Sequence, residues 1–155
     1  MIAKINFKGY YNNEEASRNA LDSDGYIKTG DIGFFNDDGV LFIIDRKKEI
    51  FKYRGFHVNP SEIENLIYSI QGVKIVTVVA LPDLYRTSMA AAAIVKNLNS
   101  PLTTDEVLEF VTSQLPAYKH LHGGTFFFDE LPMTPNGKIL KREVKEKILK
   151  IIEQN

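Results

Sequence analysis

The chain has 155 residues, a formal net charge of −1 and no cysteine. This length suits one ordinary domain, or a small domain with part of another. A charge close to zero gives no electrostatic footprint for nucleic acid or for an anionic membrane, so we expect no nucleic-acid partner. The lack of cysteine excludes disulfides and thiolate metal sites, and it fits a reducing compartment.

We expect no membrane span, signal peptide or peroxisomal terminus in this sequence. No apolar run approaches the ~20 residues of a membrane span, so we expect none. The first ten residues, MIAKINFKGY, lack the long apolar core of a signal peptide, and the chain ends in Glu153-Gln154-Asn155 rather than Ser-Lys-Leu. We expect a cytoplasmic location, although these features leave the compartment open.

The first third of the chain predicts a small β-rich segment. Residues 1–7 alternate as in a strand, and Asn13 is placed to cap a short helix over the sequence EEASRNAL. A turn at 22–25 and a hairpin around the turn 36–39 follow. So few strands cannot bury their own faces in water. We therefore expect residues 1–45 to be the incomplete, C-terminal end of a larger domain.

The remaining residues predict an α+β domain over 46–155. Asn59 and Pro60 are typical of the first residues of a helix, and Thr103 and Glu106 have the spacing of a capping box at a second helix. β-Branched and alanine-rich runs at 74–81 and 89–95 predict paired strands, and TFFFDEL predicts another. A last helix is expected from about residue 140. Together these elements predict a small mixed sheet with flanking helices.

Asp31 lies at the centre of the stretch YIKTGDIGFF. A carboxylate in a glycine-containing loop at a strand edge can accept two hydrogen bonds from a vicinal diol, as in a ribose. The alternative is an acid that caps a turn, which is the commoner use of a loop carboxylate.

The stretch DRKKEIFKYRGFHVNPSEIE, residues 45–64, carries five cations within its first ten positions. A solvated basic loop is one explanation. Gly55 favours another, because a glycine among bulky residues lowers stability unless the backbone must bend or a ligand must approach closely.

Lys138 follows the tight turn of Pro135, Asn136 and Gly137 in the stretch LPMTPNGKIL. Proline presets φ, and asparagine and glycine tolerate positive φ, so these residues predict a turn directly before the last helix. A solvated lysine is the simple explanation. His120 and His122 have no third ligand near them in the sequence, so we expect no metal site.

These stretches, taken together and in this order, resemble the C-terminal portion of the adenylate-forming (AMP-binding) enzymes. That superfamily includes acyl-CoA synthetases, coumarate–CoA ligases and luciferases, and the resemblance is strongest to the luciferase and coumarate-ligase branch. The matching motifs are GYIKTGD, IIDRKKEIFKYRGFHVNPSEIE and LPMTPNGKILKRE, and they extend over nearly the whole chain. The resemblance implies that residues 46–155 form the lid domain of such an enzyme.

The resemblance also implies roles for individual residues. Asp31 would hold the ribose hydroxyls of ATP or of the acyl adenylate, and Arg46 would contact the same nucleotide. Lys48 would be the hinge about which the lid rotates. Lys52 would serve the second half-reaction, with Gly55 near the path of coenzyme A. Lys138 would be the lysine that promotes adenylation.

The implied activity is that of a ligase that activates a carboxylic acid with ATP and Mg²⁺ and then transfers it to coenzyme A. In a luciferase-like parent, oxidation would replace that transfer. The phosphate loop and the acyl pocket belong to an N-terminal adenylating domain that this sequence lacks, so we expect the isolated chain to be inactive and to hold no cofactor tightly. Thr87-Ser88 also departs from a Gly-Glu pair that is common in the family. The alternative is a non-catalytic interaction module that retains the lid fold.

Overall fold

The computed structural model describes residues 2–3, 7–83, 85 and 87–154, and it divides the chain into two compact units, residues 1–49 and 50–155. We call these the N-terminal unit and the C-terminal unit. The division falls four residues after the boundary that the sequence suggests, because Asp45 and Arg46 belong to a strand of the first unit. That these units are the end of an adenylating domain and a lid stays a prediction.

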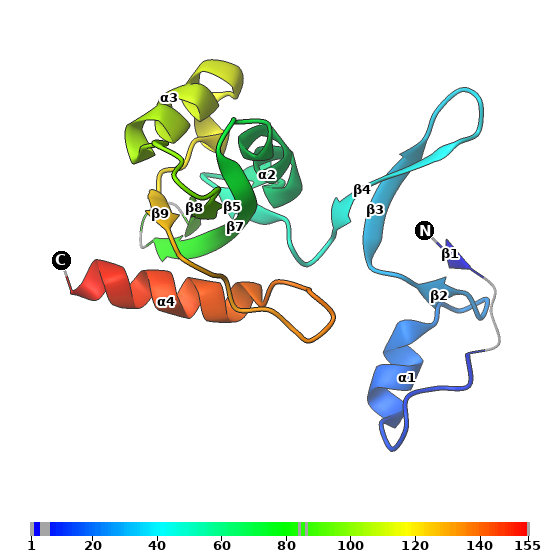
Figure 1. Cartoon of the computed structure of the whole chain (residues 1–155). Helices are drawn as coiled ribbons and strands as arrows, with labels where there is room; N and C mark the ends of the chain where they lie inside the picture. The colour runs from blue at the N-terminus through cyan, green and yellow to red at the C-terminus, as the bar shows by residue number, and fades with distance from the viewer. Residues whose placement is uncertain (1, 4–6, 84, 86, 155) are drawn as a thin grey trace. The chain divides into compact units, whose positions relative to one another are not determined.

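The N-terminal unit consists of two small antiparallel sheets and one helix (Figure 1). Its elements are β1 (Ile2–Ala3), α1 (Glu14–Ala20), β2 (Ile27–Lys28), β3 (Asp31–Phe35) and β4 (Leu41–Arg46). Asn13 caps α1 as predicted, since its side chain accepts a hydrogen bond of 2.9 Å from the Ala16 backbone N–H. The predicted first strand covers 2–3, and residues 4–6 of that prediction lie outside the described residues.

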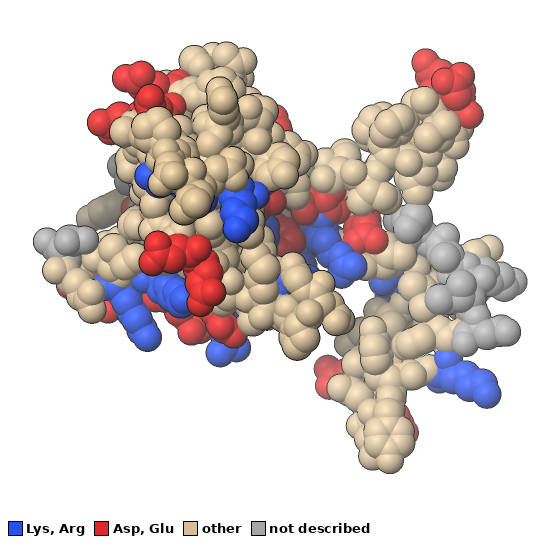
Figure 2. Space-filling model, in the orientation of Figure 1, with Lys and Arg blue, Asp and Glu red and all other residues tan. Residues whose placement is uncertain are grey.

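The β3–β4 hairpin exposes apolar side chains on both of its faces. Phe34 and Phe42 lie opposite each other and stack with ring centroids 5.3 Å apart, yet each is about half exposed. Phe35 and Ile43 lie on the other face and are also at least half exposed. Figure 2 shows the same hairpin as a largely uncharged projection with acidic residues at its tip. No residue among 7–49 is buried, so this described part of the unit forms no core of its own.

We expect the backbone amides of residues 7–49 to exchange with solvent about 10³-fold faster than those of the C-terminal core, because unburied strands open without global unfolding. Hydrogen exchange followed by mass spectrometry on the purified chain measures this directly. Limited proteolysis is expected to cut first in the turn at 47–49. Equal protection in both units would show that the N-terminal unit has packed against something.

The C-terminal unit is built on one five-stranded mixed sheet. The strands are β5 (Phe51–Tyr53), β6 (Phe56–Val58), β7 (Val73–Asp83), β8 (Thr87–Lys96) and β9 (Thr125–Phe127). Strand β8 pairs along its length with β7, while its other side meets β5 at one end and β9, in parallel, at the other. Strand β7 therefore forms one edge of the sheet and the β5–β6 hairpin forms the opposite one.

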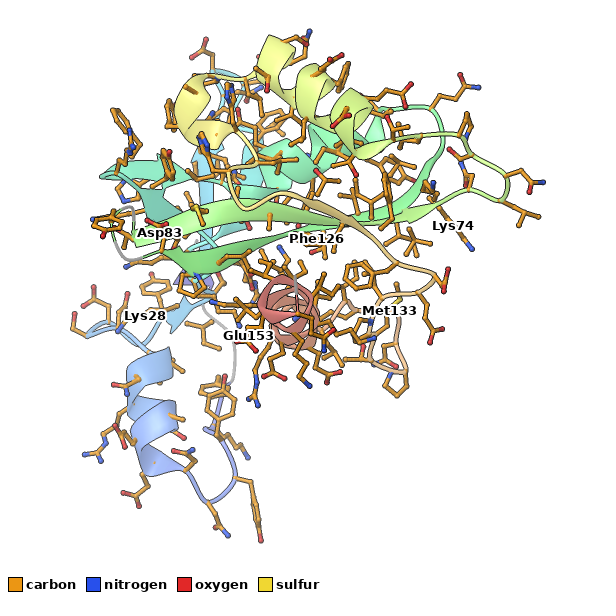
Figure 3. The ribbon with its side chains drawn as sticks, turned by 90° about the vertical axis from the view of Figure 1, so that its left-hand side faces the viewer. Lys28, Lys74, Asp83, Phe126, Met133 and Glu153 are labelled. Atoms are coloured by element: carbon orange, nitrogen blue, oxygen red, sulfur yellow. The ribbon has the colours of Figure 1, made fainter. Side chains whose placement is uncertain are left out.

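Helices cover both faces of this sheet (Figure 3). They are α2 (Pro60–Tyr68), α3 (Thr104–Gln114) and α4 (Lys141–Glu153), with a short 3₁₀ turn at Ala117–Lys119. One core joins α2 and α3 to the sheet through Val78, Ala92, Ile94, Ile63, Ile67, Val107 and Val111. The other joins α4 to the opposite face through Val79, Leu81, Ala91, Ala93, Val144 and Ile148. The predicted α+β class with a small mixed sheet is confirmed.

The starts of α2 and α3 follow from local chemistry. Asn59 accepts a hydrogen bond of 2.9 Å from the Ser61 N–H, and Pro60 occupies the first helical position. Thr103 and Glu106 form the predicted reciprocal capping box. The Thr103 backbone N–H and hydroxyl both donate to the Glu106 carboxylate, and these bonds hold the pKa of Glu106 below its usual value.

Candidate functional site

Asp31 and Arg46 lie side by side in the N-terminal unit. They face each other across the β3–β4 ladder, and Arg46 Nε approaches Asp31 Oδ1 to 2.8 Å. The Asp31 side chain is 18% exposed and the Arg46 side chain 54%. Asp31 starts a strand, and its own N–H donates to Thr29 Oγ1 at 3.2 Å. A carboxylate and a guanidinium thus share one strand end, where they offer an acceptor for hydroxyls and donors for an anion.

Lys48 lies in the turn 47–49, which joins the two units. The turn begins where the Lys47 N–H donates to the Gly30 carbonyl at 2.8 Å, and it closes where the Glu49 N–H donates to the Arg46 carbonyl at 2.9 Å. The Lys48 side chain is exposed. Its backbone therefore occupies the short connection at which the compact units separate.

Lys52 and Gly55 belong to the β5–β6 hairpin. Lys52 is exposed and pairs with His57 across the ladder. The two turn residues, Arg54 and Gly55, have φ of 49° and 87°, which is the pattern of the tight hairpin turn that matches strand twist. A Cβ added at Gly55 would have no neighbour within 4 Å, so backbone conformation alone accounts for the glycine in this unit.

Aromatic rings support this hairpin from one side. The buried Tyr53 ring stacks on His122 with centroids 4.6 Å apart, and Phe56 stacks on Tyr118 at 4.9 Å. The Nε2 atoms of His120 and His122 each bond a backbone carbonyl oxygen at 2.8 Å. These contacts give both histidines a packing role. The part of the chain that the structure describes contains no group of three or more His, Asp or Glu side chains placed to hold a metal ion.

Lys138 is carried by a closed three-residue hairpin. The Gly137 N–H donates to the Thr134 carbonyl at 2.9 Å, and the Thr134 N–H donates to the Lys138 carbonyl at 2.8 Å. Gly137 takes φ of 78°, and it is the one residue of the predicted Pro-Asn-Gly turn with positive φ. This is a β-turn followed by a left-handed residue, a common hairpin geometry. The predicted turn is confirmed, and Lys138 lies exposed at its end.

Thr134 is a residue of this loop that the sequence analysis missed. Its hydroxyl oxygen accepts a hydrogen bond of 3.1 Å from the Lys138 N–H, in addition to the two backbone bonds that Thr134 makes. A threonine directly before a Pro-Asn-Gly turn is a recognisable signal for such bonding. The backbone of Lys138 is thereby fixed while its ammonium stays free to meet a ligand.

Thr87 occupies the position at which the sequence departs from the family pattern. Its φ is 74°, in the left-handed region, where a β-branched side chain is strained and glycine is not. Thr87 is the first residue of β8 and pairs with Tyr53, the chain neighbour of Lys52, so the departure lies beside the β5–β6 hairpin that carries Lys52. Among the described residues, no helix combines the length and apolar character needed to cross a membrane.

The sequence of this chain is similar to those of known proteins. Residues 62–138 match the model of the AMP-binding enzyme C-terminal domain. The 4-coumarate–CoA ligase 3 of Oryza sativa subsp. japonica is 41% identical over 141 residues, which make up 91% of this chain and 25% of that protein. The chain thus spans about a quarter of the length of the curated relatives it matches.

Solved structures also match this chain in fold. ATP-bound MatB from Rhodopseudomonas palustris matches with a TM-score of 0.85 and 29% identity, over 94% of this chain and 29% of that one. The o-succinylbenzoate CoA synthetase MenE from Bacillus subtilis, solved with its acyl-adenylate intermediate, matches with a TM-score of 0.80 and 27% identity, over 89% and 28%. The chain therefore belongs to the adenylate-forming (AMP-binding) enzymes and corresponds to the C-terminal portion of that family.

Proposed function

We propose that this chain is the C-terminal part of an AMP-forming acid–CoA ligase, with residues 46–155 as its mobile lid, and that it acts together with an upstream adenylating domain. In the complete enzyme, the carboxylate of the acid attacks the α-phosphorus of ATP and pyrophosphate leaves. The thiol of coenzyme A then attacks the carbonyl of the acyl adenylate and AMP leaves. The lid would rotate between these two steps, as domains do about short hinges.

The observation that carries this proposal is the Lys138 hairpin. Its backbone bonds fix the chain on both sides of an exposed ammonium, immediately before a well-packed helix. During adenylation, negative charge builds up between the attacking carboxylate and the α-phosphate. A cation that is already in place stabilises that charge without reorganisation, which is the largest contribution to many enzymatic rates.

Asp31 and Arg46 suit the nucleotide. The Asp31 carboxylate can accept hydrogen bonds from the ribose hydroxyls, while the Arg46 guanidinium can donate hydrogen bonds to a phosphate or to the ribose. Their 2.8 Å ion pair holds both groups at one strand end. ATP would arrive with Mg²⁺, whose ligands would come from its phosphates, from water and from the adenylating domain.

Lys48, Lys52 and Gly55 suit the second half-reaction. Lys48 lies in the connecting turn, where a change of a few dihedral angles would reorient the C-terminal unit. Lys52 is an exposed cation on a tight hairpin, and the open space at Gly55 leaves room for an extended ligand such as the pantetheine arm of coenzyme A. Two of the named relatives, the 4-coumarate–CoA ligase and the o-succinylbenzoate CoA synthetase, use coenzyme A by name, which favours coenzyme A over oxygen in this step.

The experiment is ATP–pyrophosphate exchange with two proteins. The purified 155-residue chain is expected to show no exchange and to bind ATP no tighter than about 1 mM, because it supplies only a few of the contacts that ATP needs. The same chain fused behind the adenylating domain of a 4-coumarate–CoA ligase is expected to restore exchange with that relative's acid.

Each arm can contradict the proposal. Exchange by the chain alone, free of other ligases, would show that its ATP site is complete. A fusion that folds and binds ATP but never forms adenylate would favour the non-catalytic interaction module instead.

A further inference from the structure

Glu64 connects three elements at the edge of the sheet in the C-terminal unit. It lies on α2, and its Oε1 atom accepts hydrogen bonds from the Val78 N–H at 2.7 Å, from the Thr77 hydroxyl at 3.1 Å and from the Lys141 ammonium at 2.9 Å. The Glu64 side chain is 19% exposed and that of Lys141 29%. One carboxylate oxygen thus binds strand β7 and helix α4 at the same time.

The ion pair between Glu64 and Lys141 joins two helices, α2 and α4, that pack on opposite faces of the sheet (Figure 3). The Val78 N–H belongs to β7, whose other side pairs with β8, so it points out of the free edge of the sheet. Glu64 reaches around this edge to meet Lys141. Since β7 holds the carboxylate through both a backbone and a side-chain donor, the position of the carboxylate is fixed.

Helix α4 needs such an anchor more than its neighbours do. The first residue before it, Leu140, makes no side-chain capping bond, whereas α1, α2 and α3 are capped by Asn13, Asn59 and Thr103. A lysine at the first helical position is also unfavourable next to the positive end of the helix dipole. The Glu64 carboxylate offsets the second effect, because it places a negative charge against the Lys141 ammonium at that end of the helix.

We infer that Glu64 is a positioning residue for Lys138 and acts through Lys141. Lys141 follows the Lys138 hairpin directly, and the base of that hairpin is closed by the Leu140 N–H bond to the Pro132 carbonyl at 2.9 Å. Fixing Lys141 therefore fixes the base from which Lys138 projects. This inference rests on the proposed function, since it needs Lys138 to act on the substrate.

The first test measures the anchor in the 155-residue chain itself. Lys141→Met removes the ammonium but leaves Glu64 bound to β7, so the fold is expected to persist. The amides of Leu140 and Lys138 should then exchange about fivefold faster by NMR, as expected for loss of a partly exposed ion pair. Arg142→Met is the matched control, because it removes the exposed pair with Glu146 one residue further along the same helix. It should leave those amides unchanged.

The second test measures the consequence in the fusion with an adenylating domain. Lys141→Met and Glu64→Gln are each expected to lower kcat of adenylate formation about fivefold with the KM for ATP unchanged, because the ground-state contacts of ATP stay intact. Lys141→Arg keeps the cation and should restore the rate, and Arg142→Met should match the parent. Consumption of supplied acyl adenylate should not change in any of them.

The outcomes separate this inference from the proposed function. If Lys138→Ala slows adenylation while Lys141→Met and Glu64→Gln do not, Glu64 has no positioning role and the proposed function stands. Faster exchange at Leu140 with an unchanged kcat would likewise make the ion pair purely structural and overturn the inference. If Lys138→Ala leaves adenylation unchanged, both the proposed function and the inference fail.

Discussion

Replacing Lys138 with alanine in the fusion enzyme is expected to slow adenylate formation by about 10²–10³-fold, the effect of deleting one donor at a developing charge. The loss should fall on kcat, because the ammonium is needed while the carboxylate attacks phosphorus and contributes little to binding ATP. Single-turnover release of pyrophosphate measures this step. Lys147→Ala is the matched control, since it removes an exposed lysine of α4 outside the proposed site.

The same Lys138→Ala enzyme should still convert a supplied acyl adenylate to the CoA thioester at nearly the parent rate. That step has no pentavalent phosphorus to stabilise. An equal loss in both half-reactions would mean that Lys138 supports the fold or the docking of the lid instead of the chemistry.

Replacing Lys52 with alanine is expected to give the converse result. Adenylate should form normally, but its transfer to coenzyme A should slow by about 10–100-fold, the size of a lost charge-assisted hydrogen bond. The structural reason is that the two lysines are associated with opposite edges of the sheet. Lys52 lies on the β5–β6 edge, whereas the Lys138 hairpin leads into Lys141, which is bound at the opposite, β7 edge.

One rigid pose would not bring both edges to one small reacting centre, so the proposed mechanism includes a rotation about the turn at Lys48. The measurement is thioester formation from synthetic adenylate, with Lys74→Ala as a control for removing an exposed lysine from the same sheet. If Lys52→Ala and Lys138→Ala slow the same half-reaction equally, the two-pose mechanism is wrong for this protein.

Much of the fold could be predicted because its signals are local. A capping side chain and the N–H groups it binds lie within three residues, so Asn13, Asn59 and Thr103 mark helix starts without knowledge of the rest of the chain. The same holds for the turn that ends at Gly137. Gly55 shows the limit of such signals. Its sequence context indicates a bend or a close ligand, and only the observed φ shows that the turn itself requires glycine.

The candidate site could be predicted less completely. The roles of Lys138 and Lys52 come from the resemblance to a family, and they stay predictions until the half-reactions are timed. The contact between Glu64 and Lys141 joins residues 77 positions apart, and no periodic pattern links them. It arises because α2 and α4 both pass the same strand edge, and that arrangement exists only once the sheet has formed.

The hydrogen bond between the Glu64 carboxylate and β7 also has a consequence for association between molecules. An unprotected edge strand presents free N–H and C=O groups, to which the strand of another chain can add. β7 is eleven residues long and rich in valine, so its outer edge is well suited to such addition. The Glu64 carboxylate already occupies the Val78 N–H, and α2 and α4 flank the same edge. We therefore expect the Glu64 carboxylate, through its bond to the Val78 N–H, to oppose the addition of a strand from another molecule at this edge.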